Sequence, residues 1–272
     1  MDRKVALVTG ASSGIGAEVS LALLRLGYTV HGAARRVDRM APLVAAGGQA
    51  VALDLTDDAS IQACVSTLLA NEGRLDVLVN NAGYGSYGAI EDVSLAEARR
   101  QFEVNLFGLA RLTQLALPAM RAQRSGHVFN VSSMGGKLST PMGGWYHATK
   151  HALEGFSDAL RMEVAPFGVH VVIIEPGAIA SEWSGLAQES LVASSGAGPY
   201  ATQARAFAAL MARADGQGSP PRVVADAVVR ALRARRPRTR YVMGTGARPA
   251  LLARRWLPDR AYDGMLRLLL RG

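Results

Sequence analysis

A tyrosine and a lysine four residues apart, Tyr146 and Lys150, are the residues whose types and spacing most directly suggest chemistry. On a helix, side chains with this spacing lie on one face, about one turn apart. An unperturbed phenol, with a pKa near ~10, is a poor acid–base catalyst at neutral pH, but a neighbouring ammonium favours the phenolate and lowers that pKa. The pair therefore predicts a general acid–base catalyst. Its spacing alone is not specific, because any helix can contain it.

A glycine-rich turn near the start of the chain predicts a phosphate-binding site. The segment at 9–16 reads TGASSGIG, follows an apolar run and opens an amphipathic helical pattern. Glycines allow a sharp turn and a close approach of the backbone to a pyrophosphate, which then meets the amides of the helix N-terminus. The GxxxGxG spacing excludes an ATPase P-loop. Considered alone, the three glycines are explained about equally well by a tight strand-to-helix turn.

The end of the second apolar run, 29–34, bears on which dinucleotide is bound. An acid there would accept the ribose hydroxyls of NAD, but the sequence reads AARR at 33–36, and the first carboxylate, Asp38, is expected in the next helix. Arg35, together with Arg36, offers a planar charged fork to a 2′-phosphate, which favours NADP(H). The alternative is that both arginines are ordinary surface residues at a helix start.

Seven short apolar runs alternate with helical patterns and predict the elements that position these residues. Several runs are apolar at consecutive positions, as in parallel strands that are covered on both faces. Strands are expected at 5–9, 29–34, 49–55, 75–80, 127–133, 169–175 and 240–243. No linker divides the 272 residues. The predicted fold is α/β, a single-domain Rossmann-type doubly wound parallel sheet of about seven strands.

Two stretches interrupt this alternation within the single domain, residues 1–272. Residues 181–221 follow the sixth strand, and residues 244–272 follow the seventh. Ligands of open α/β sheets bind beyond the carboxyl ends of the strands, so 181–221 are expected to form a small substrate-covering lobe. The last stretch is expected to be a basic and apolar C-terminal extension.

The distribution of charge bears on the expected partners. The net charge is +8, but residues 222–272 hold 13 Arg and 3 Asp, which leaves the rest of the chain close to neutral. No nucleic-acid-binding module is recognisable in this basic part, so no nucleic acid is expected and a solvated basic rim is favoured. Weak contact with an anionic membrane surface is the alternative, because the leucines at 268–270 lie between Arg267 and Arg271.

Other features bear on the compartment and on metals. The single cysteine, Cys64, has no intrachain partner, which predicts a reducing, cytoplasmic compartment. The first residues lack the features of a secretory signal. No transmembrane segment is expected, because Asn105 and Arg111 interrupt the longest apolar helix pattern. Two histidines, His147 and His151, have no nearby ligand partners, so no metal site is expected.

In chain order, these motifs resemble those of the short-chain dehydrogenase/reductase family over nearly the whole chain. The matches are TGASSGIG at 9–16, Asp54-Leu55, Asn80-Asn81-Ala82-Gly83, Asn105, Ser133, Tyr146-His-Ala-Thr-Lys150 and Pro176-Gly177. The resemblance is to the compact branch that carries TGxxxGxG. It implies an NADP(H)-dependent oxidoreductase that moves a hydride between nicotinamide and a carbonyl or alcohol carbon. A homodimer or homotetramer is expected.

The resemblance gives catalytic roles to four residues. Tyr146 would exchange a proton with the substrate oxygen, Lys150 would lower the tyrosine pKa and bind the nicotinamide ribose, and Ser133 would hold that oxygen as charge develops. Ser132 is the rival serine, but alternation along a strand and the spacing to Tyr146 favour Ser133. Asn105 matches the family's asparagine that positions a water in a proton relay. The competing interpretation is a satisfied buried amide in a bent helix.

The resemblance also implies a cofactor site. Its expected members are Gly10, Ser12, Ser13, Gly14, Ile15, Gly16, Arg35, Arg36, Asp54, Leu55, Asn81, Ala82, Gly83, Tyr146, Lys150, Pro176, Gly177, Ile179 and Ser181. Asp54 and the run at 81–83 would line the adenine and its ribose. Ser181 stands where the family usually has a threonine near the carboxamide, and little consequence is expected because a hydroxyl is retained.

The expected substrate is a small hydrophobic alcohol or ketone of steroid, retinoid or similar type. The segments at 146–168 and 171–179 look like those of hydroxysteroid and retinol dehydrogenases. The lobe would add Trp183, Leu186, Tyr200, Phe207, Leu210 and Met211. These apolar side chains would serve equally well to pack the lobe onto the body.

Two other functions are weighed against a dehydrogenase. A sugar-nucleotide epimerase would share the YxxxK motif, but that branch usually has a different glycine spacing and a longer chain. A non-catalytic NADP(H)-binding sensor or regulatory protein would be expected to lose Ser133, Tyr146 or Lys150, and all three are present.

Overall fold

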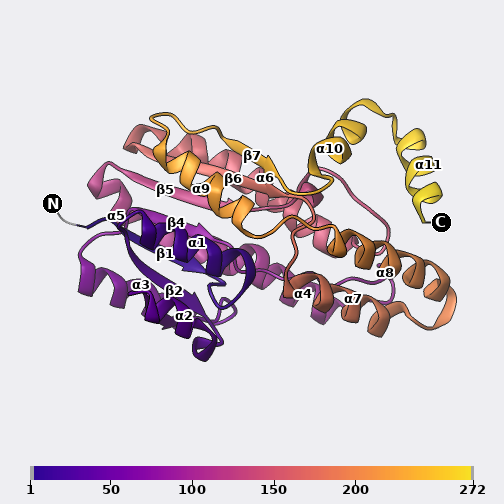
Figure 1. Ribbon diagram of the computed structural model, residues 1–272, viewed down its shortest axis with the longest axis horizontal. Helices are drawn as coiled ribbons and strands as arrows, with labels where there is room; N and C mark the ends of the chain where they lie inside the picture. Colours follow the sequence, from indigo (N-terminus) through magenta and orange to yellow (C-terminus); the bar gives the residue numbers. More distant parts are fainter. Residues whose placement is uncertain (1–2, 271–272) are drawn as a thin grey trace.

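The computed structural model describes residues 3–270 and contains one parallel sheet (Figure 1). The strands are β1 (Val5–Thr9), β2 (Thr29–Ala34), β3 (Gln49–Ala52), β4 (Val77–Asn80), β5 (Gly126–Val131), β6 (Val169–Pro176) and β7 (Arg240–Met243). All are parallel, in the order β3-β2-β1-β4-β5-β6-β7. This order, with the crossover helices, confirms the predicted Rossmann-type doubly wound fold.

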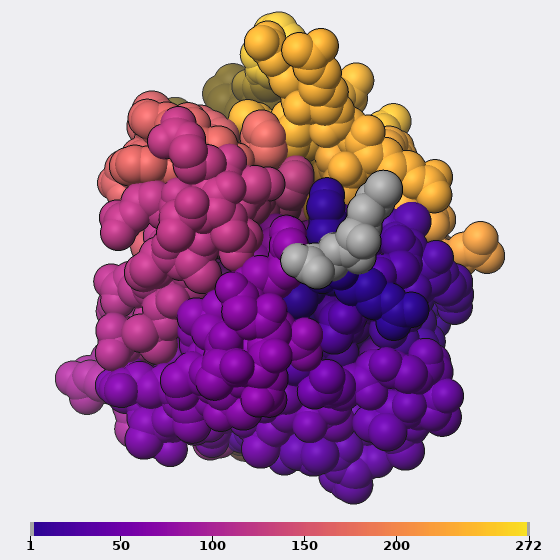
Figure 2. Space-filling model, turned by 90° about the vertical axis from the view of Figure 1, so that its left-hand side faces the viewer, coloured from indigo at the N-terminus to yellow at the C-terminus, as the bar shows by residue number. Residues whose placement is uncertain are grey.

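Helices cover both faces of the sheet and extend beyond one end of it (Figure 1). They are α1 (Gly14–Arg25), α2 (Ala41–Ala45), α3 (Asp58–Glu72), α4 (Leu95–Phe102), α5 (Gly108–Gln123), α6 (Gly144–Val164), α7 (Glu182–Ser195), α8 (Ala201–Gly216), α9 (Arg222–Arg233), α10 (Ala247–Trp256) and α11 (Asp259–Leu269). Figure 2 shows the opposite end, where the orange segment that includes α9 lies beside the indigo N-terminal segment, in agreement with the packing of α9 on α1.

Alternate residues of the central strands face two separate cores. In β1, Ala6 and Val8 pack with α1 and α9, whereas Val5 and Leu7 pack with α3, α5 and α6. All four are buried. Burial of a Val or Leu side chain contributes roughly 1.5–3 kcal/mol, so both faces of the sheet stabilise the fold. Burial on both faces also explains why these strands are continuous apolar runs in the sequence.

Two strands end earlier than the apolar runs predict. β3 ends at Ala52 instead of 55, because the Asp54 carboxylate accepts hydrogen bonds from the backbone N–H of Thr56 at 2.9 Å and from its hydroxyl at 2.8 Å, which turns the chain. β5 ends at Val131 instead of 133. Its continuation is stopped by the Ser133 hydroxyl, which accepts a hydrogen bond from the Gly135 N–H at 3.0 Å. Both turns direct polar side chains to the carboxyl edge of the sheet.

The two stretches that interrupt the alternation are helical. Residues 181–221 contain α7 and α8, which pack against each other, and the C-terminal extension contains α10 and α11. Figure 1 shows all four at one end of the sheet. In α11, Leu268 is 69% exposed, while Leu270, just after the helix, packs against an apolar cluster that contains Tyr146. The predicted contact of Arg271 lies outside the described residues. Within residues 3–270, no helix is long and apolar enough to cross a bilayer.

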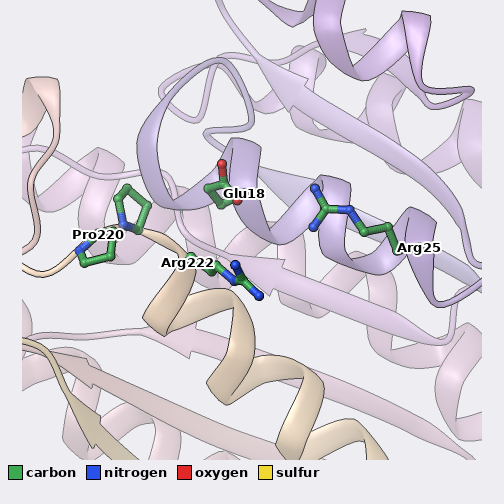
Figure 3. A pocket seen from close by; sticks show the side chains of 5 residues that line it. Glu18, Arg25, Pro220 and Arg222 are labelled. Carbon is green, nitrogen blue, oxygen red and sulfur yellow. The ribbon is translucent and has the colours of Figure 1, made fainter.

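A hollow of about 570 Å³ lies on the surface between α1 and the start of α9 (Figure 3). It is lined by Glu18, Arg25, Pro220, Pro221 and Arg222. It contains none of the residues that are predicted to bind a cofactor or to act in catalysis. An arginine of this hollow, such as Arg25, is therefore a suitable control for the arginines that are predicted to bind the cofactor.

Candidate active site

Tyr146 and Lys150 lie side by side on the buried face of α6. Their exposed fractions are 7% and 6%. The Lys150 Nζ lies 5.9 Å from the centre of the Tyr146 ring and donates a hydrogen bond to the carbonyl oxygen of Val131, at the end of β5, at 2.9 Å. The spacing of four residues thus places an ammonium beside a phenol at the carboxyl edge of the sheet.

Burial dominates the protonation of this pair. Burial raises the pKa of Tyr146 to about 12, against the opposing effect of its hydrogen bond with Ser133. Burial also lowers the pKa of Lys150 to about 8, and the charge of Glu154 acts in the opposite direction. The sequence led us to expect a lowered tyrosine pKa. In this structure the phenol is neutral near pH 7, which is the form that can give a proton to a substrate oxygen.

The serine next to Tyr146 is Ser133, not Ser132. Ser133 follows β5 and caps a short 3₁₀ turn at Met134–Gly136, which holds its hydroxyl against Tyr146. Ser132 is 4% exposed, and its hydroxyl oxygen has no hydrogen-bond partner among the described residues. The adjacent serines therefore have different surroundings, as alternation along an extended segment requires.

Asn105 braces the loop after β4 against α6. It lies in a π-helical turn, Glu103–Phe107, between α4 and α5 and is fully buried. Its side-chain amide donates to the Tyr84 carbonyl oxygen at 2.9 Å and to the Thr149 hydroxyl at 3.1 Å, and its Oδ1 accepts from the Tyr84 N–H at 3.1 Å. The side chain is thus a satisfied buried amide in a bent helix. The proton-relay role of Asn105 stays a prediction.

The glycines of the first turn are required by its geometry. Gly10 and Gly14 have φ angles of +68° and +53°, which favour glycine. A Cβ on Gly16 would lie 2.3 Å from the carbonyl oxygen of Gly10. Ser13 precedes α1, but its side chain does not cap the helix. The backbone amides of the first helical turn therefore donate no hydrogen bond to the Ser13 hydroxyl. This cradle fits a phosphate group.

The other predicted cofactor residues lie at the carboxyl ends of neighbouring strands. Ser12 lies in the turn after β1, and Ile15 is the second residue of α1. Arg35 and Arg36 follow β2, Asp54 and Leu55 follow β3, the run at 81–83 follows β4, and Pro176, Gly177, Ile179 and Ser181 end or follow β6. The structure thus brings the whole predicted set to one edge of the sheet. Leu55 and Ile179 are at most 7% exposed and belong to the two cores.

Specific contacts fix several of these residues. The hydroxyl of Thr9 accepts hydrogen bonds from the backbone N–H groups of Asn81 and Ala82, each at 3.0 Å, which ties the end of β4 to the end of β1. Hydrogen bonds from Thr56 lower the pKa of Asp54, and the charge of Arg35 lowers it further. Arg35 and Asp54 therefore lie near each other, where the adenine ribose is expected.

A family model described as short chain dehydrogenase matches residues 4–190, which include the glycine turn, Tyr146 and Lys150. The chain belongs to the short-chain dehydrogenase family. It is 35% identical to a Helicobacter pylori protein named probable short-chain type dehydrogenase/reductase VdlC, with 98% of each chain covered. It is 30% identical to 3-ketodihydrosphingosine reductase of Bacteroides thetaiotaomicron, again with 98% of each chain covered. Human retinol dehydrogenase 8 is 36% identical, over 72% of this chain and 66% of the human one.

Solved structures of short-chain dehydrogenases have the same fold. One from Streptomyces avermitilis is 38% identical, with a TM-score of 0.81 over 100% of this chain and 98% of that one. A metagenomic enzyme in complex with NADP is 31% identical, with a TM-score of 0.69 over 88% and 96% of the two chains. A Burkholderia phymatum enzyme in complex with NAD is 28% identical, with a TM-score of 0.81 over 98% and 95%. Both nicotinamide cofactors thus occur among the structural neighbours.

In this short-chain dehydrogenase, aromatic side chains cover the predicted catalytic tyrosine. The Tyr146 ring centre lies 5.5 Å from that of Tyr87, in the loop after β4, and 5.2 Å from that of Trp183, in α7. Phe207 of α8 stacks on Tyr87 at 6.0 Å. Sequence reasoning named Trp183 and Phe207 but missed Tyr87. Its position four residues after the 81–83 run was the available signal, because that loop starts at the site.

His147, beside the predicted catalytic tyrosine of this dehydrogenase, is a packing residue. Its ring nitrogens contact the carbonyl oxygen of Gly135 at 3.1 Å and the Thr140 hydroxyl at 3.0 Å. Burial lowers its pKa to about 4, so the ring is neutral at neutral pH. Within the described residues, no group of three or more His, Cys, Asp or Glu side chains could hold a metal ion.

A buried charge cluster lies behind Lys150, one turn further along α6. Glu154 Oε2 lies 2.9 Å from Lys137 Nζ and 3.0 Å from Arg240 Nη2. Arg240 also lies 3.2 Å from Glu175 Oε1. Burial and the charge of Glu154 raise the pKa of Glu175 to about 7. The cluster links α6, β6 and β7, but ionisation of Glu175 has a free-energy cost in the folded state.

Glu175→Gln is expected to raise the midpoint of thermal unfolding at pH 8. The folded-state pKa of Glu175 is raised, so its ionisation reduces stability progressively as pH rises from the unfolded value near ~4.5 through about 7. The gain should therefore shrink towards pH 5. Thermal unfolding of both proteins between pH 5 and 8 measures this. A loss of stability at pH 8 would mean that the ion pair with Arg240 outweighs the cost of burying the carboxylate.

Proposed function

We propose that this short-chain dehydrogenase is an NADP(H)-dependent oxidoreductase that interconverts a carbonyl and an alcohol. The observation that carries the proposal is the buried contact of Tyr146 with Ser133 and Lys150 beside the glycine cradle. The bound cofactor supplies the hydride for the carbonyl carbon. In reduction, Ser133 holds the substrate oxygen, and the neutral Tyr146 hydroxyl gives it a proton. Lys150 binds the nicotinamide ribose and keeps a positive charge beside the phenol that is being deprotonated.

The preference for NADP(H) rests on the end of β2. Arg35 and Arg36 are exposed there, and Ala34 stands where an acid would accept the ribose hydroxyls of NAD. A guanidinium can bind the 2′-phosphate through two parallel hydrogen bonds. Asp54 does not take the place of the missing acid, because it follows β3 and its Oδ1 already accepts two hydrogen bonds from Thr56.

The proposed substrate is a hydrophobic ketone or secondary alcohol. Residues 181–221, as the substrate-covering lobe, contribute side chains that pack around Tyr146 and Tyr87; they are Trp183, Tyr200, Phe207, Leu210 and Met211. Leu186 is 56% exposed and is not part of this cover. The names of two relatives, a retinol dehydrogenase and a 3-ketodihydrosphingosine reductase, also indicate large apolar substrates for those proteins.

A screen of NADPH oxidation with steroid, retinoid, aromatic and aliphatic carbonyl compounds tests the proposed function. We expect turnover that increases from short aliphatic ketones to larger apolar ones, because the side chains around Tyr146 are apolar. If NADPH binds in calorimetry but is not oxidised in the presence of any of these compounds, the result would instead favour the non-catalytic sensor.

Self-association as a homodimer or homotetramer belongs to the same proposal. Leu95 and Phe107 are 58% and 53% exposed, and both line an apolar hollow over α4 and α6 together with Trp145. Large exposed apolar side chains that cluster in this way are typical of protein interfaces. We place the enzyme in the cytoplasm, as the buried and unpaired Cys64 favours a reducing compartment.

A further inference from the structure

The first turn of α7 contacts both the cofactor side and the substrate side of the site. Its first residue, Glu182, binds Arg39 Nη1 through both carboxylate oxygens, at 2.9 and 3.0 Å, and lies 3.5 Å from Arg36 Nη2. The next residue, Trp183, lies against the catalytic Tyr146, with the ring centres 5.2 Å apart. Consecutive residues therefore connect the arginines after β2 to the cover over the catalytic phenol.

Trp183 occupies space that a substrate needs. Its indole packs against Tyr146 and edge-on against Tyr87, at 6.1 Å. It also sits closely on Gly85, where a Cβ would lie 2.6 Å from the indole. Tyr146 is only 7% exposed, and Trp183 is one of the side chains that cover it. A carbonyl oxygen that is to receive the Tyr146 proton must come within hydrogen-bond distance of its hydroxyl, so the indole has to move.

One of the two arginines that hold Glu182 is a predicted ligand of the 2′-phosphate, and the other lies close to it. Arg36 is a predicted phosphate ligand, and Arg39 follows it by one turn in the 3₁₀ helix Val37–Met40. These side chains and Glu182 are each about half exposed, so water screens the ion pairs and a dianionic phosphate can replace the carboxylate. Once bound, the phosphate repels Glu182.

We propose that Glu182 is a specificity-determining residue that competes with the cofactor 2′-phosphate for Arg36 and Arg39, and that its release frees Trp183 from Tyr146. The proposal rests on the proposed NADP(H)-dependent function. NAD has no 2′-phosphate and leaves the Glu182 ion pairs in place. Glu182 therefore makes access to Tyr146 depend on which dinucleotide is bound, in addition to any difference in cofactor affinity.

Acrylamide quenching of Trp183 fluorescence tests the proposal directly. The chain has three tryptophans, so the Trp183 signal is the difference between each protein and the same protein carrying Trp183→Phe. We expect adenosine 2′,5′-bisphosphate to increase the quenching of Trp183, and adenosine 5′-diphosphate to leave it unchanged. Glu182→Gln should show the increased quenching without any ligand. Glu189→Gln, which removes an exposed carboxylate two turns further along α7, is the matched control and should behave as the unmodified protein.

Kinetics give a second measurement. With NADH as cofactor, Glu182→Gln should lower the KM for the carbonyl substrate by about twofold to fivefold, the range expected for one or two screened ion pairs. The Glu189→Gln variant should keep the original KM. If Glu182→Gln and the unmodified protein show the same quenching and the same KM, the proposed role of Glu182 would be overturned. If adenosine 2′,5′-bisphosphate does not bind in calorimetry, the NADP(H) assignment would be overturned instead. The comparison of Glu182→Gln with the unmodified protein in the absence of ligand tests the role of Glu182 separately from that assignment.

Discussion

Tyr146→Phe is expected to lower the kcat of carbonyl reduction by about two to four orders of magnitude, the usual contribution of a positioned proton donor. NADPH binding should remain within about twofold, because the phenyl ring keeps the packing with Tyr87 and Trp183. Single-turnover oxidation of NADPH with the best substrate from the screen, together with calorimetric titration of NADPH, measures both quantities.

The control for this substitution is Tyr28→Phe, which removes the hydroxyl of a partly buried tyrosine that packs on the core beside α1. It should leave kcat unchanged. Lys150→Ala should impair both turnover and NADPH binding, because the ammonium is proposed to act on both. A Tyr146→Phe enzyme with most of its activity would contradict the mechanism, since the proton would then come from another group.

The unmodified enzyme is expected to prefer NADPH to NADH by about one to two orders of magnitude in kcat/KM. A hydrogen bond between charged groups contributes roughly 1.5–3 kcal/mol, and the 2′-phosphate offers one to Arg35 that NADH lacks. The double substitution Ala34→Asp with Arg35→Ser should reverse the preference. The new carboxylate would accept the ribose hydroxyls and repel the phosphate. Steady-state kinetics with both cofactors measures the change.

Two further variants make a reversal of the cofactor preference interpretable. One is the single substitution Arg35→Ser, and the other is the substitution of a distant arginine, Arg25. Ala34 is only 8% exposed, so Arg35→Ser alone provides a variant without a new charge at the edge of the core. It should weaken the use of NADPH and leave the use of NADH unchanged. Arg25→Ser removes an arginine from the hollow between α1 and α9 and should affect neither cofactor (Figure 3). Equal use of NADH and NADPH by the unmodified enzyme would contradict the role of Arg35 but not the reductase mechanism.

The sheet could be predicted from the sequence because its strands are buried on both faces and so are apolar at nearly every position. The strand ends were less predictable. At Asp54 and Ser133 a side chain replaces a strand hydrogen bond, and such local competition is not visible in an apolar pattern. That Tyr146, Lys150 and Ser133 lie together was predictable, because Tyr146 and Lys150 share one helix and Ser133 lies two residues after the end of β5. Their catalytic roles stay predictions.

The contacts that surround this set could not be predicted in the same way. Tyr87 and Trp183 meet because a loop after β4 and a helix after β6 reach the same place, and no spacing in the sequence encodes that meeting. The ion pair of Arg39 with Glu182 likewise joins residues on different sides of the site. The π-helical turn that holds Asn105 depends on the contacts of its amide with Tyr84 and Thr149, which exist only in the folded chain.

The strand order also determines when the nascent chain can begin to complete its sheet on the ribosome. β1 pairs with β2 on one side and with β4 on the other, but β1 ends at Thr9 and β4 begins only at Val77. At a synthesis rate of about 5–20 residues per second, the intervening segment takes roughly 3 to 14 seconds to emerge. During that time an apolar strand has an open edge, to which another nascent chain can add. Ribosome-associated chaperones that cover such edges should therefore bind this chain during synthesis of its first third.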